Sequence, residues 1–261
     1  MKKLFFFSIL ASLFLYGCSL LSATKEEVKP QATTPKDVIG KVKLRTIYPD
    51  IESQTPIDEW GYEYDSASGN LKQQTRYDVN TFPKKILNYI IYKYDSAKRL
   101  QSTQLFSRNV NAPSGFSVTE ETTFKYTNDT LKLLTERVVL NSQNNTARTF
   151  RYVYERNRLL RMTNPALTPP GYVTYEYNTA GNKARENRYS SLNLIYEYTT
   201  FTYSSSDTLL ARSTVFDPDN SPRTITTYQY NSSKKRTVEE VKQQKLATNQ
   251  SNFVVKYTYY E

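Results

Sequence analysis

The feature that most constrains this chain is a short aromatic motif that recurs eight times. An aromatic residue, any residue and then Tyr occur together at intervals of 23 to 32 residues, measured between the second tyrosines. Such self-similarity is the mark of a repeat architecture, so one structural unit is expected to recur from about residue 60 to residue 261. The eight pairs are Tyr62/Tyr64, Tyr92/Tyr94, Phe124/Tyr126, Tyr152/Tyr154, Tyr175/Tyr177, Phe201/Tyr203, Tyr228/Tyr230 and Tyr257/Tyr259.

Each pair ends a run of residues that is typical of a β-strand. Positions i and i+2 lie on the same face of a strand. The residue between the two aromatics is mostly polar, as with Glu63 and Lys93, and Val153 is the exception. Each strand is therefore predicted to have one aromatic face and one polar face. Core packing is the preferred interpretation of the aromatic rings, and a groove in which sugars stack on them is the alternative.

A turn and a second strand are predicted after each pair. Segments such as 65–70, 95–98 and 178–182 are rich in Asp, Asn, Ser and Gly, which make local hydrogen bonds or tolerate left-handed backbone. Each repeat is thus expected to be a β-hairpin with a short loop. The return connections are longer and richer in Pro and Asn, as in 109–115, 141–146, 164–171, 217–222 and 248–252. The expected second strands begin near Leu71, Leu100, Leu131, Leu159 and Leu209.

The strand count predicts an all-β fold. Residues 42–48 alternate as a strand before the first pair, seven hairpins follow, and the eighth pair lies on a last strand, which gives about 16 strands in eight hairpin-like repeats. Pairing of the first strand with the last would close this antiparallel meander and remove both edges. The expected form is a closed or flattened barrel, with a strongly curved sheet or an open spiral as alternatives.

The direction of the aromatic face decides between a soluble and a membrane-spanning barrel. Sixteen strands enclose a ring too wide for side chains to fill. Charged residues occur in mid-strand on both faces, and a charge facing lipid costs about 2–4 kcal/mol at the midplane. The soluble barrel is therefore the preferred interpretation, and a membrane-spanning barrel is the alternative. The mid-strand charges include Glu136, Arg137, Glu186, Arg188, Glu239 and Glu240.

Composition excludes much of catalytic chemistry. The chain has no His and one Cys, so it can build neither a Ser-His-Asp triad nor an internal disulfide. Adjacent acidic residues on a strand point to opposite faces, so the two carboxylates of such a pair cannot bind the same atom. Asp217 and Asp219 lie in a segment that is typical of a turn. We expect no enzyme activity, no metal site and no cofactor. The adjacent acidic pairs are Asp58/Glu59, Glu120/Glu121 and Glu239/Glu240.

The amino terminus is typical of an exported lipoprotein. Lys2 and Lys3 precede an apolar run that is too short to span a membrane, and the run ends at Gly17 and Cys18. This ending resembles the bacterial lipobox, which implies cleavage between Gly17 and Cys18 and lipidation of Cys18. Residues 1–17 are then a signal peptide, 18–37 a flexible tether and 38–261 a single β-repeat domain. Ser19 favours the outer membrane of a Gram-negative bacterium.

The segments 64–71 and 94–100 resemble the YD (RHS) repeat. Each has Tyr-Asp, a short turn and then Leu, and Arg99 precedes the Leu in the second. Together with the lipobox, the divergent hairpins are similar to a family of small bacterial lipoproteins of unknown function with a porin-like barrel. The resemblance implies architecture and location, and it implies no reaction.

One basic cluster interleaves with aromatic residues. It could bind a polyanion by charge and cation–π contacts, or it could be the solvated face and turn of one hairpin, which is the preferred interpretation. A lipid-tethered exported protein has little contact with nucleic acid, so we expect partners to be the membrane, an envelope protein or a polysaccharide. The expected function is a non-enzymatic envelope scaffold or binding module; the alternatives are a lipidated pore and an unrecognised glycan hydrolase. The basic cluster is Arg148, Arg151, Arg156, Arg158 and Arg161.

Overall fold

The computed structural model describes residues 40–127, 131–165, 171–204, 209–244 and 252–260, with the side chain of residue 164 excepted. This part of the chain contains sixteen β-strands and no helix. The strands are β1 Val42–Tyr48, β2 Asp58–Tyr64, β3 Leu71–Asp78, β4 Lys85–Tyr94, β5 Leu100–Arg108, β6 Phe116–Tyr126, β7 Leu134–Asn141, β8 Thr146–Glu155, β9 Arg158–Asn164, β10 Gly171–Tyr177, β11 Lys183–Tyr189, β12 Ile195–Tyr203, β13 Leu210–Phe216, β14 Pro222–Tyr230, β15 Arg236–Gln243 and β16 Phe253–Tyr259.

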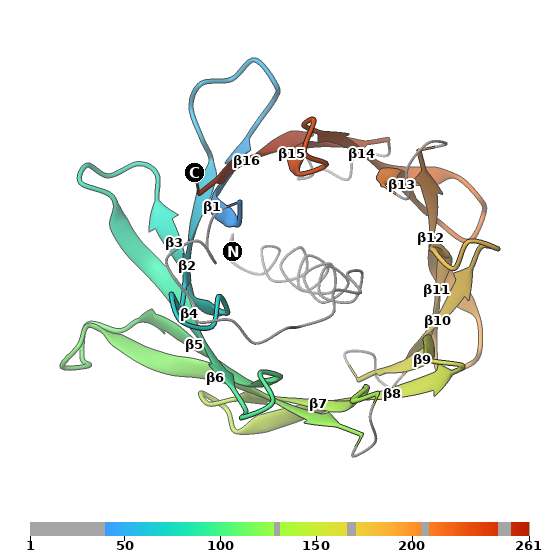
Figure 1. Ribbon diagram of the computed structural model, residues 1–261, viewed down its shortest axis with the longest axis horizontal. Coiled ribbons are helices and arrows are strands. Elements are labelled where there is room, and N and C mark those ends of the chain that lie inside the picture. The colour runs from blue at the N-terminus through green and yellow to red at the C-terminus, as the bar shows by residue number, and fades with distance from the viewer. Residues whose placement is uncertain (1–39, 128–130, 166–170, 205–208, 245–251, 261) are drawn as a thin grey trace. The chain divides into compact units, whose positions relative to one another are not determined.

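The strands form one closed antiparallel barrel, which confirms the predicted fold class. Each strand pairs with its neighbours in sequence, and β1 pairs with β16 to close the ring (Figure 1). At this seam Ile47 lies opposite Val255 and Arg45 lies opposite Tyr257. Closure pairs both strands that a meander would otherwise leave as free edges. Of the forms that the sequence leaves open, the closed barrel is the one observed.

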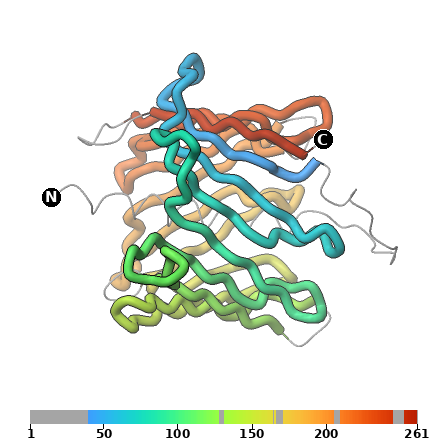
Figure 2. Tube along the Cα trace, turned by 90° about the vertical axis from the view of Figure 1, so that its left-hand side faces the viewer, coloured from blue at the N-terminus to red at the C-terminus, as the bar shows by residue number. Residues whose placement is uncertain are grey.

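The two ends of the barrel differ in their connections. The β2–β3 connection and every second one after it lie at one end, which we call the short-turn end, and the other connections lie at the opposite end, the long-loop end (Figure 2). The β1–β2 and β15–β16 connections at the long-loop end are the longest, with nine residues each. The predicted difference holds only in part, because the β7–β8 connection at the long-loop end has four residues and the β6–β7 connection at the short-turn end has seven. In the β4–β5 turn, Asp95 Oδ1 accepts the N–H groups of Ala97 and Arg99 at 2.9 and 2.8 Å. Lys98 beside it has a left-handed backbone, with φ of 59°. Residues of the Asp and Asn type at the start of the turn therefore fix its shape, as expected.

The predicted strand starts hold, with one exception. β3 and β5 begin at Leu71 and Leu100, while β9 and β13 begin within one residue of the predicted leucines. The prediction for Leu131 was wrong, because β7 begins at Leu134. Lys132 has a φ of 49°, so the turn extends past Leu131 before the chain becomes extended.

The tyrosine pairs lie on the inner face of the barrel. Residues that pair across strands share a face, and ten of the twelve buried apolar side chains share the face of the Tyr pairs. The concave side of a curved sheet crowds its side chains, so this more buried face is the inner one. The ten residues are Ile47, Trp60, Ile90, Val139, Met162, Val173, Tyr175, Phe201, Val241 and Val255.

The outer face is polar and charged along much of its length. Lys125 pairs with Glu136 at 2.7 Å on this face, and the Lys125 side chain is 69% exposed. Arg151, on the neighbouring β8, is also highly exposed and lies 3.7 Å from Glu136. In the described ranges no helix is long and apolar enough to cross a membrane.

Candidate functional site

The second tyrosine of most pairs links neighbouring hairpins at the short-turn end. Tyr94 donates its hydroxyl hydrogen bond to the carbonyl of Leu71 at 3.0 Å, and Tyr177 donates to Leu159 at 2.9 Å. The acceptor is always the main chain at the start of the second strand of the preceding hairpin. We call these tyrosines the inner tyrosine belt; they are Tyr94, Tyr126, Tyr177, Tyr203, Tyr230 and Tyr259.

A β-bulge accompanies the second tyrosine in all seven hairpins. Tyr94 pairs with Leu100 while Lys93 pairs with Ser102, so the partner strand carries one extra residue opposite the tyrosine. The same shift occurs at the other six hairpins. A bulge bends the strand locally and re-aims its side chains. The repeat therefore positions the start of each second strand where the next hairpin's tyrosine reaches it.

Cations cover several of these rings. The guanidinium carbon of Arg99 lies 5.0 Å from the ring centroid of Tyr126, and that of Arg158 lies 5.7 Å from the centroid of Tyr177. Each arginine directly precedes the residue whose carbonyl accepts the tyrosine hydrogen bond. Arg99 also pairs with Asp95 at 2.7 Å, so this part of the YD-like motif holds a cation over the next hairpin's ring.

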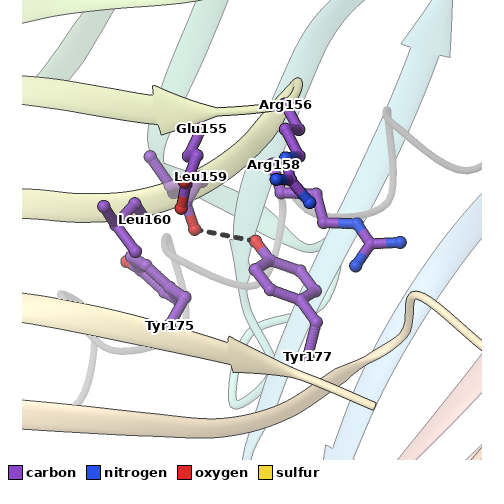
Figure 3. A pocket seen from close by; sticks show the side chains of 7 residues that line it. All are labelled: Glu155, Arg156, Arg158, Leu159, Leu160, Tyr175 and Tyr177. Atoms are coloured by element: carbon purple, nitrogen blue, oxygen red, sulfur yellow. Dashed lines mark hydrogen bonds between the residues drawn. The ribbon is translucent and has the colours of Figure 1, made fainter. Parts of the chain in front are cut away.

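One pocket lies between the β8–β9 turn and β10. Figure 3 shows Tyr175 and Tyr177 on one side and the turn with Glu155, Arg156 and Arg158 on the other. The pocket has a volume of about 470 Å³. We call it the Tyr177 pocket; it is lined by Glu155, Arg156, Arg158, Leu159, Leu160, Tyr175 and Tyr177.

A second pocket occupies the same place in another repeat. Tyr92 and Tyr94 stand where Tyr175 and Tyr177 stand in the first, and Leu71 takes the place of Leu159. Its volume is about 350 Å³. We call it the Tyr94 pocket; it is lined by Asp65, Ser68, Asn70, Leu71, Lys72, Tyr92, Tyr94, Asp95 and Lys98. Equivalent residues of two repeats, a tyrosine pair and a polar turn, thus line both pockets.

Three tyrosine hydroxyls of these pockets have a raised pKa and stay protonated at neutral pH. Burial raises the pKa of Tyr94 and Tyr177, although the hydrogen bonds to Leu71 and Leu159 act in the opposite direction. Burial also raises the pKa of Tyr175, with the Glu186 carboxylate adding to the effect. Neutral phenols are hydrogen-bond donors, and their rings present apolar surface. The pockets therefore offer apolar and polar contacts, with no activated nucleophile.

The inner wall also carries a network of ion pairs. Lys183 and Arg188 each lie 3.1 Å from the buried carboxylate of Glu186. Arg188 also contacts Glu197 at 3.1 Å, and Arg223 pairs with Glu197 in turn. Burial would raise the pKa of Glu186, but Lys183 and Arg188 outweigh it and the pKa is lowered. The charges on this side of the barrel are thus mutually compensated.

The structure divides the predicted basic cluster between several surfaces. Arg148 is on the inner face, 3.8 Å from Glu120, whereas Arg151 and Arg161 are on the outer face. Only Arg156 and Arg158 come together, at the Tyr177 pocket. One polyanion patch made of all five arginines therefore does not form. Alternation along β8 explains the first separation, because residues three apart on a strand, such as Arg148 and Arg151, point to opposite faces.

The acidic pairs are separated as the sequence predicts. Asp58 and Glu239 point inward, and their neighbours Glu59 and Glu240 point outward. Asp217 and Asp219 lie in the β13–β14 connection, where Asp219 accepts the N–H of Ser221 at 2.9 Å. No group of three or more His, Cys, Asp and Glu side chains gathers in the described part of the chain. Gly17 and Cys18 lie outside the described residues.

Comparison with known proteins gives likeness at the level of structure alone. The sequence matches no known family and no curated protein. A porin-like protein from Bacteroides uniformis matches 87% of this chain and 98% of its own chain, at 13% identity and a TM-score of 0.36. A porin-like protein from Bacteroides vulgatus matches 84% of this chain and 98% of its own, at 10% identity and a TM-score of 0.34.

A third similar structure is much longer than this protein. The TcdB2-TccC3-TEV crystal structure matches 91% of this chain at 13% identity and a TM-score of 0.33. This chain spans 13% of that chain's length. Porin-like proteins are thus among the similar structures, as the resemblance of the repeats implies.

Proposed function

We propose that this protein is a non-enzymatic binding protein of the bacterial cell envelope, held at the outer membrane by a lipid on Cys18. Its barrel would bind an envelope glycan at the short-turn end. The observation that supports this is the recurrence of one pocket in two repeats, the Tyr177 pocket and the Tyr94 pocket. Both volumes fall within the range of about 300–1,000 Å³ that is usual for ligand sites.

The lining of the pockets favours a sugar over other small ligands. Tyrosine rings can pack against the C–H face of a sugar, and carboxylate, amide and cationic groups can bind its hydroxyls. The Tyr94 pocket has Asp65, Asn70, Asp95 and Lys98, and the Tyr177 pocket has Glu155 and two arginines. A polymer with repeating units could occupy more than one such pocket, which raises its overall affinity.

The test removes one basic side chain from each pocket and keeps the backbone of the turn. Arg156 and Lys98 line the two pockets with φ of 47° and 59°, a conformation in which glycine is favourable. Arg156→Gly combined with Lys98→Gly should weaken binding of envelope glycan fragments about ten-fold, measured by calorimetry, since hydrogen bonds to charged groups contribute about 1.5–3 kcal/mol. Lys234→Gly, at a left-handed residue in the β14–β15 turn, is the matched control. Equal affinity of the unsubstituted protein, the double variant and the Lys234→Gly control would refute binding at these pockets.

A lipidated outer-membrane pore is the second candidate. The closed ring of sixteen strands favours it, since porins of 16–18 strands leave a channel. The outer-face charges of Lys125, Glu136 and Arg151 oppose it. Lys or Arg on a lipid-facing surface costs about 2–4 kcal/mol at the midplane and about 0–1 kcal/mol near the interfaces. Arg151 is in the middle of β8, so it opposes a membrane-spanning barrel more than Lys125 near the end of β6 does. Solubility of residues 38–261 without detergent supports the binding protein. Aggregation without detergent, together with conductance across a planar bilayer, would support the pore.

A further inference from the structure

Exposed apolar side chains are concentrated at the long-loop end of the barrel. Ten large apolar side chains of the described residues are exposed, and seven of them lie in or beside the long connections. The side chain of Phe82 is 102% exposed and that of Val110 is 88% exposed. We call this surface the long-loop rim; its exposed apolar residues are Ile51, Ile57, Phe82, Ile86, Val110, Leu192 and Leu194.

These side chains are spread around the ring instead of forming one patch. They lie on or beside the β1–β2, β3–β4 and β5–β6 loops, which are neighbours, and on the β11–β12 loop across the ring (Figure 1). A protein partner is held by a contiguous apolar centre within a polar rim. Separate apolar points at one end of a cylinder instead fit a flat surface that meets all of them at once, as a bilayer does.

Aromatic stacks stand directly behind this rim on the outer wall. Tyr172 stacks on Tyr189 with centroids 4.6 Å apart, and Tyr198 stacks on Phe216 at 4.8 Å. Tyr189 and Phe216 are the last residues of β11 and β13, where these strands enter their long loops. The Tyr172 hydroxyl donates to the Asn193 side chain in the β11–β12 loop at 3.0 Å. The Tyr172–Tyr189 stack and the exposed β11–β12 loop are thus one connected surface.

Cations lie over two of these outer rings and over Tyr48, the last residue of β1. The guanidinium carbons of Arg161 and Arg185 lie 3.9 and 4.0 Å from the centroids of Tyr172 and Tyr198. The Lys256 ammonium lies 4.4 Å from the centroid of Tyr48. Aromatic rings and basic side chains together are the residues that favour the headgroup level of a membrane. The formal net charge of the whole chain is +10, and without Lys2 and Lys3 of the predicted signal peptide it is +8, which also favours an anionic surface.

Two acidic side chains at this end of the barrel, Asp50 and Asp217, have partners close by. Asp50 accepts the N–H groups of Glu52 and Ser53 at 3.0 and 2.7 Å. Asp217 lies 3.5 Å from Arg223. The Arg223 guanidinium offsets the Asp217 charge, which reduces the repulsion that an anionic surface would meet beside the β13–β14 connection.

We propose that the long-loop rim docks on a phospholipid bilayer, with its apolar side chains among the lipids and the Tyr172–Tyr189 stack at headgroup level. This contact is separate from the lipid on Cys18 and independent of glycan binding. The pockets lie at the opposite end of the barrel, so docking would turn them away from the bilayer. The predicted tether of about 20 residues, 18–37, can extend to about 70 Å. A nine-residue strand is roughly 30 Å long, so the tether is long enough to pass the barrel and reach the bilayer in this orientation.

A fluorescence experiment tests the location of the contact. The protein is produced from residue 18 with Cys18→Ser, so that neither acyl chains nor the apolar run of residues 4–16 can hold it on a vesicle. Since the sequence has one Cys, Phe82→Cys or Leu131→Cys then gives a single site for a polarity-sensitive dye. Leu131 is 50% exposed and lies at the short-turn end, which makes it the control. With vesicles of phosphatidylethanolamine and phosphatidylglycerol, the dye at position 82 should shift to the blue and be quenched by nitroxide lipids. An unchanged dye at position 82, or an equal response at position 131, would overturn the proposal.

A sedimentation experiment tests whether the long-loop rim binds a bilayer or a second copy of the chain. Phe82→Ser, Val110→Ser and Leu192→Ser together should lower co-sedimentation with these vesicles at least ten-fold, while Leu131→Ser should change it less than two-fold. All four positions are exposed, and circular dichroism verifies that the variants are folded. Absence of sedimentation with vesicles would overturn the proposal. Self-association of the unsubstituted protein in buffer that the triple variant abolishes would also overturn it, by assigning the rim to a second copy of the chain.

Discussion

The hydroxyl of Tyr94 donates a hydrogen bond to the main-chain carbonyl of Leu71, 3.0 Å away in the preceding hairpin. The same relation joins Tyr177 to Leu159 and recurs in the rest of the inner tyrosine belt. Each bond ties a side chain of one repeat to the backbone of the repeat before it. The motif that marks the repeats in the sequence therefore also connects them in space.

Replacing Tyr94 by Phe is expected to lower the free energy of unfolding by about 1 kcal/mol. The substitution keeps the ring and removes the hydroxyl, so the Leu71 carbonyl loses its donor. Urea unfolding followed by circular dichroism measures the difference. Tyr172→Phe is the control, because its hydroxyl bonds the exposed Asn193 side chain, where water can replace it. An equal loss in the two variants would contradict a stabilising role for the belt.

The inner tyrosines should ionise at higher pH than free tyrosine. Burial raises the pKa of Tyr228 to about 12, although its hydrogen bond with Ser213 acts in the opposite direction. A group whose pKa is raised on folding contributes stability that is complete below the unfolded value of about 10, and this stability is lost as the pH rises through the folded value. Titration of tyrosinate absorbance should therefore show a late class of tyrosines, reduced by Tyr228→Phe. Ionisation of every tyrosine near pH 10 in the folded barrel would disprove this.

Glu186 should make the barrel sensitive to acid. Its pKa is lowered by Lys183 and Arg188 against the effect of burial. The stability that it contributes is thus present above its ordinary pKa of 4.5 and is lost as the pH falls through the lowered value. Glu186→Gln is expected to lower the free energy of unfolding at neutral pH by about 1–3 kcal/mol. Unfolding in urea at neutral and acidic pH measures both values, and the difference should shrink in acid.

The control for Glu186 is an exposed ion pair. Glu136 on the outer face pairs with Lys125, whose side chain is 69% exposed. Glu136→Gln should leave the stability nearly unchanged, since exposed pairs contribute little. A Glu186→Gln effect no larger than that of Glu136→Gln would show that the inner network is not stabilising.

Glycine at a left-handed turn position should stabilise the barrel. Lys132 has a φ of 49°, which strains a residue with a Cβ atom. Lys132→Gly is expected to raise the free energy of unfolding by about 0.5–1 kcal/mol, after the greater entropy of glycine in the unfolded chain is subtracted. Lys132→Ala keeps the strain and should give no gain. Thermal and urea unfolding distinguish the two, and a gain in the alanine variant would contradict the backbone explanation.

The periodic part of the fold could be predicted from the sequence. The spacing of the pairs set the strand count and the closed ring, and the alternation around Tyr62 and Tyr64 placed both rings on one face. Local turn residues placed the starts of β3 and β5. The start of β7 could not be found in this way, because no residue-type rule signals a left-handed lysine at position 132.

The candidate site could not be predicted, because it forms between repeats. The Tyr177 pocket depends on a bulge in β9, which brings Leu159 opposite Tyr154 and within reach of Tyr177. A bulge shifts the register by one residue and leaves no mark in composition. The outer stacks, such as Tyr198 on Phe216, likewise join residues from adjacent strands whose register only the structure gives.

The seam between β1 and β16 has a consequence for how such a barrel is made. Ile47 meets Val255, so the strands that complete the ring come from opposite ends of the repeat domain. During synthesis and export, every earlier hairpin can pair with the one before it, but β1 keeps an open hydrogen-bonding edge until β16 arrives. A chain interrupted before β16 would be left with two adhesive edges, and the cell would have to shield it or degrade it.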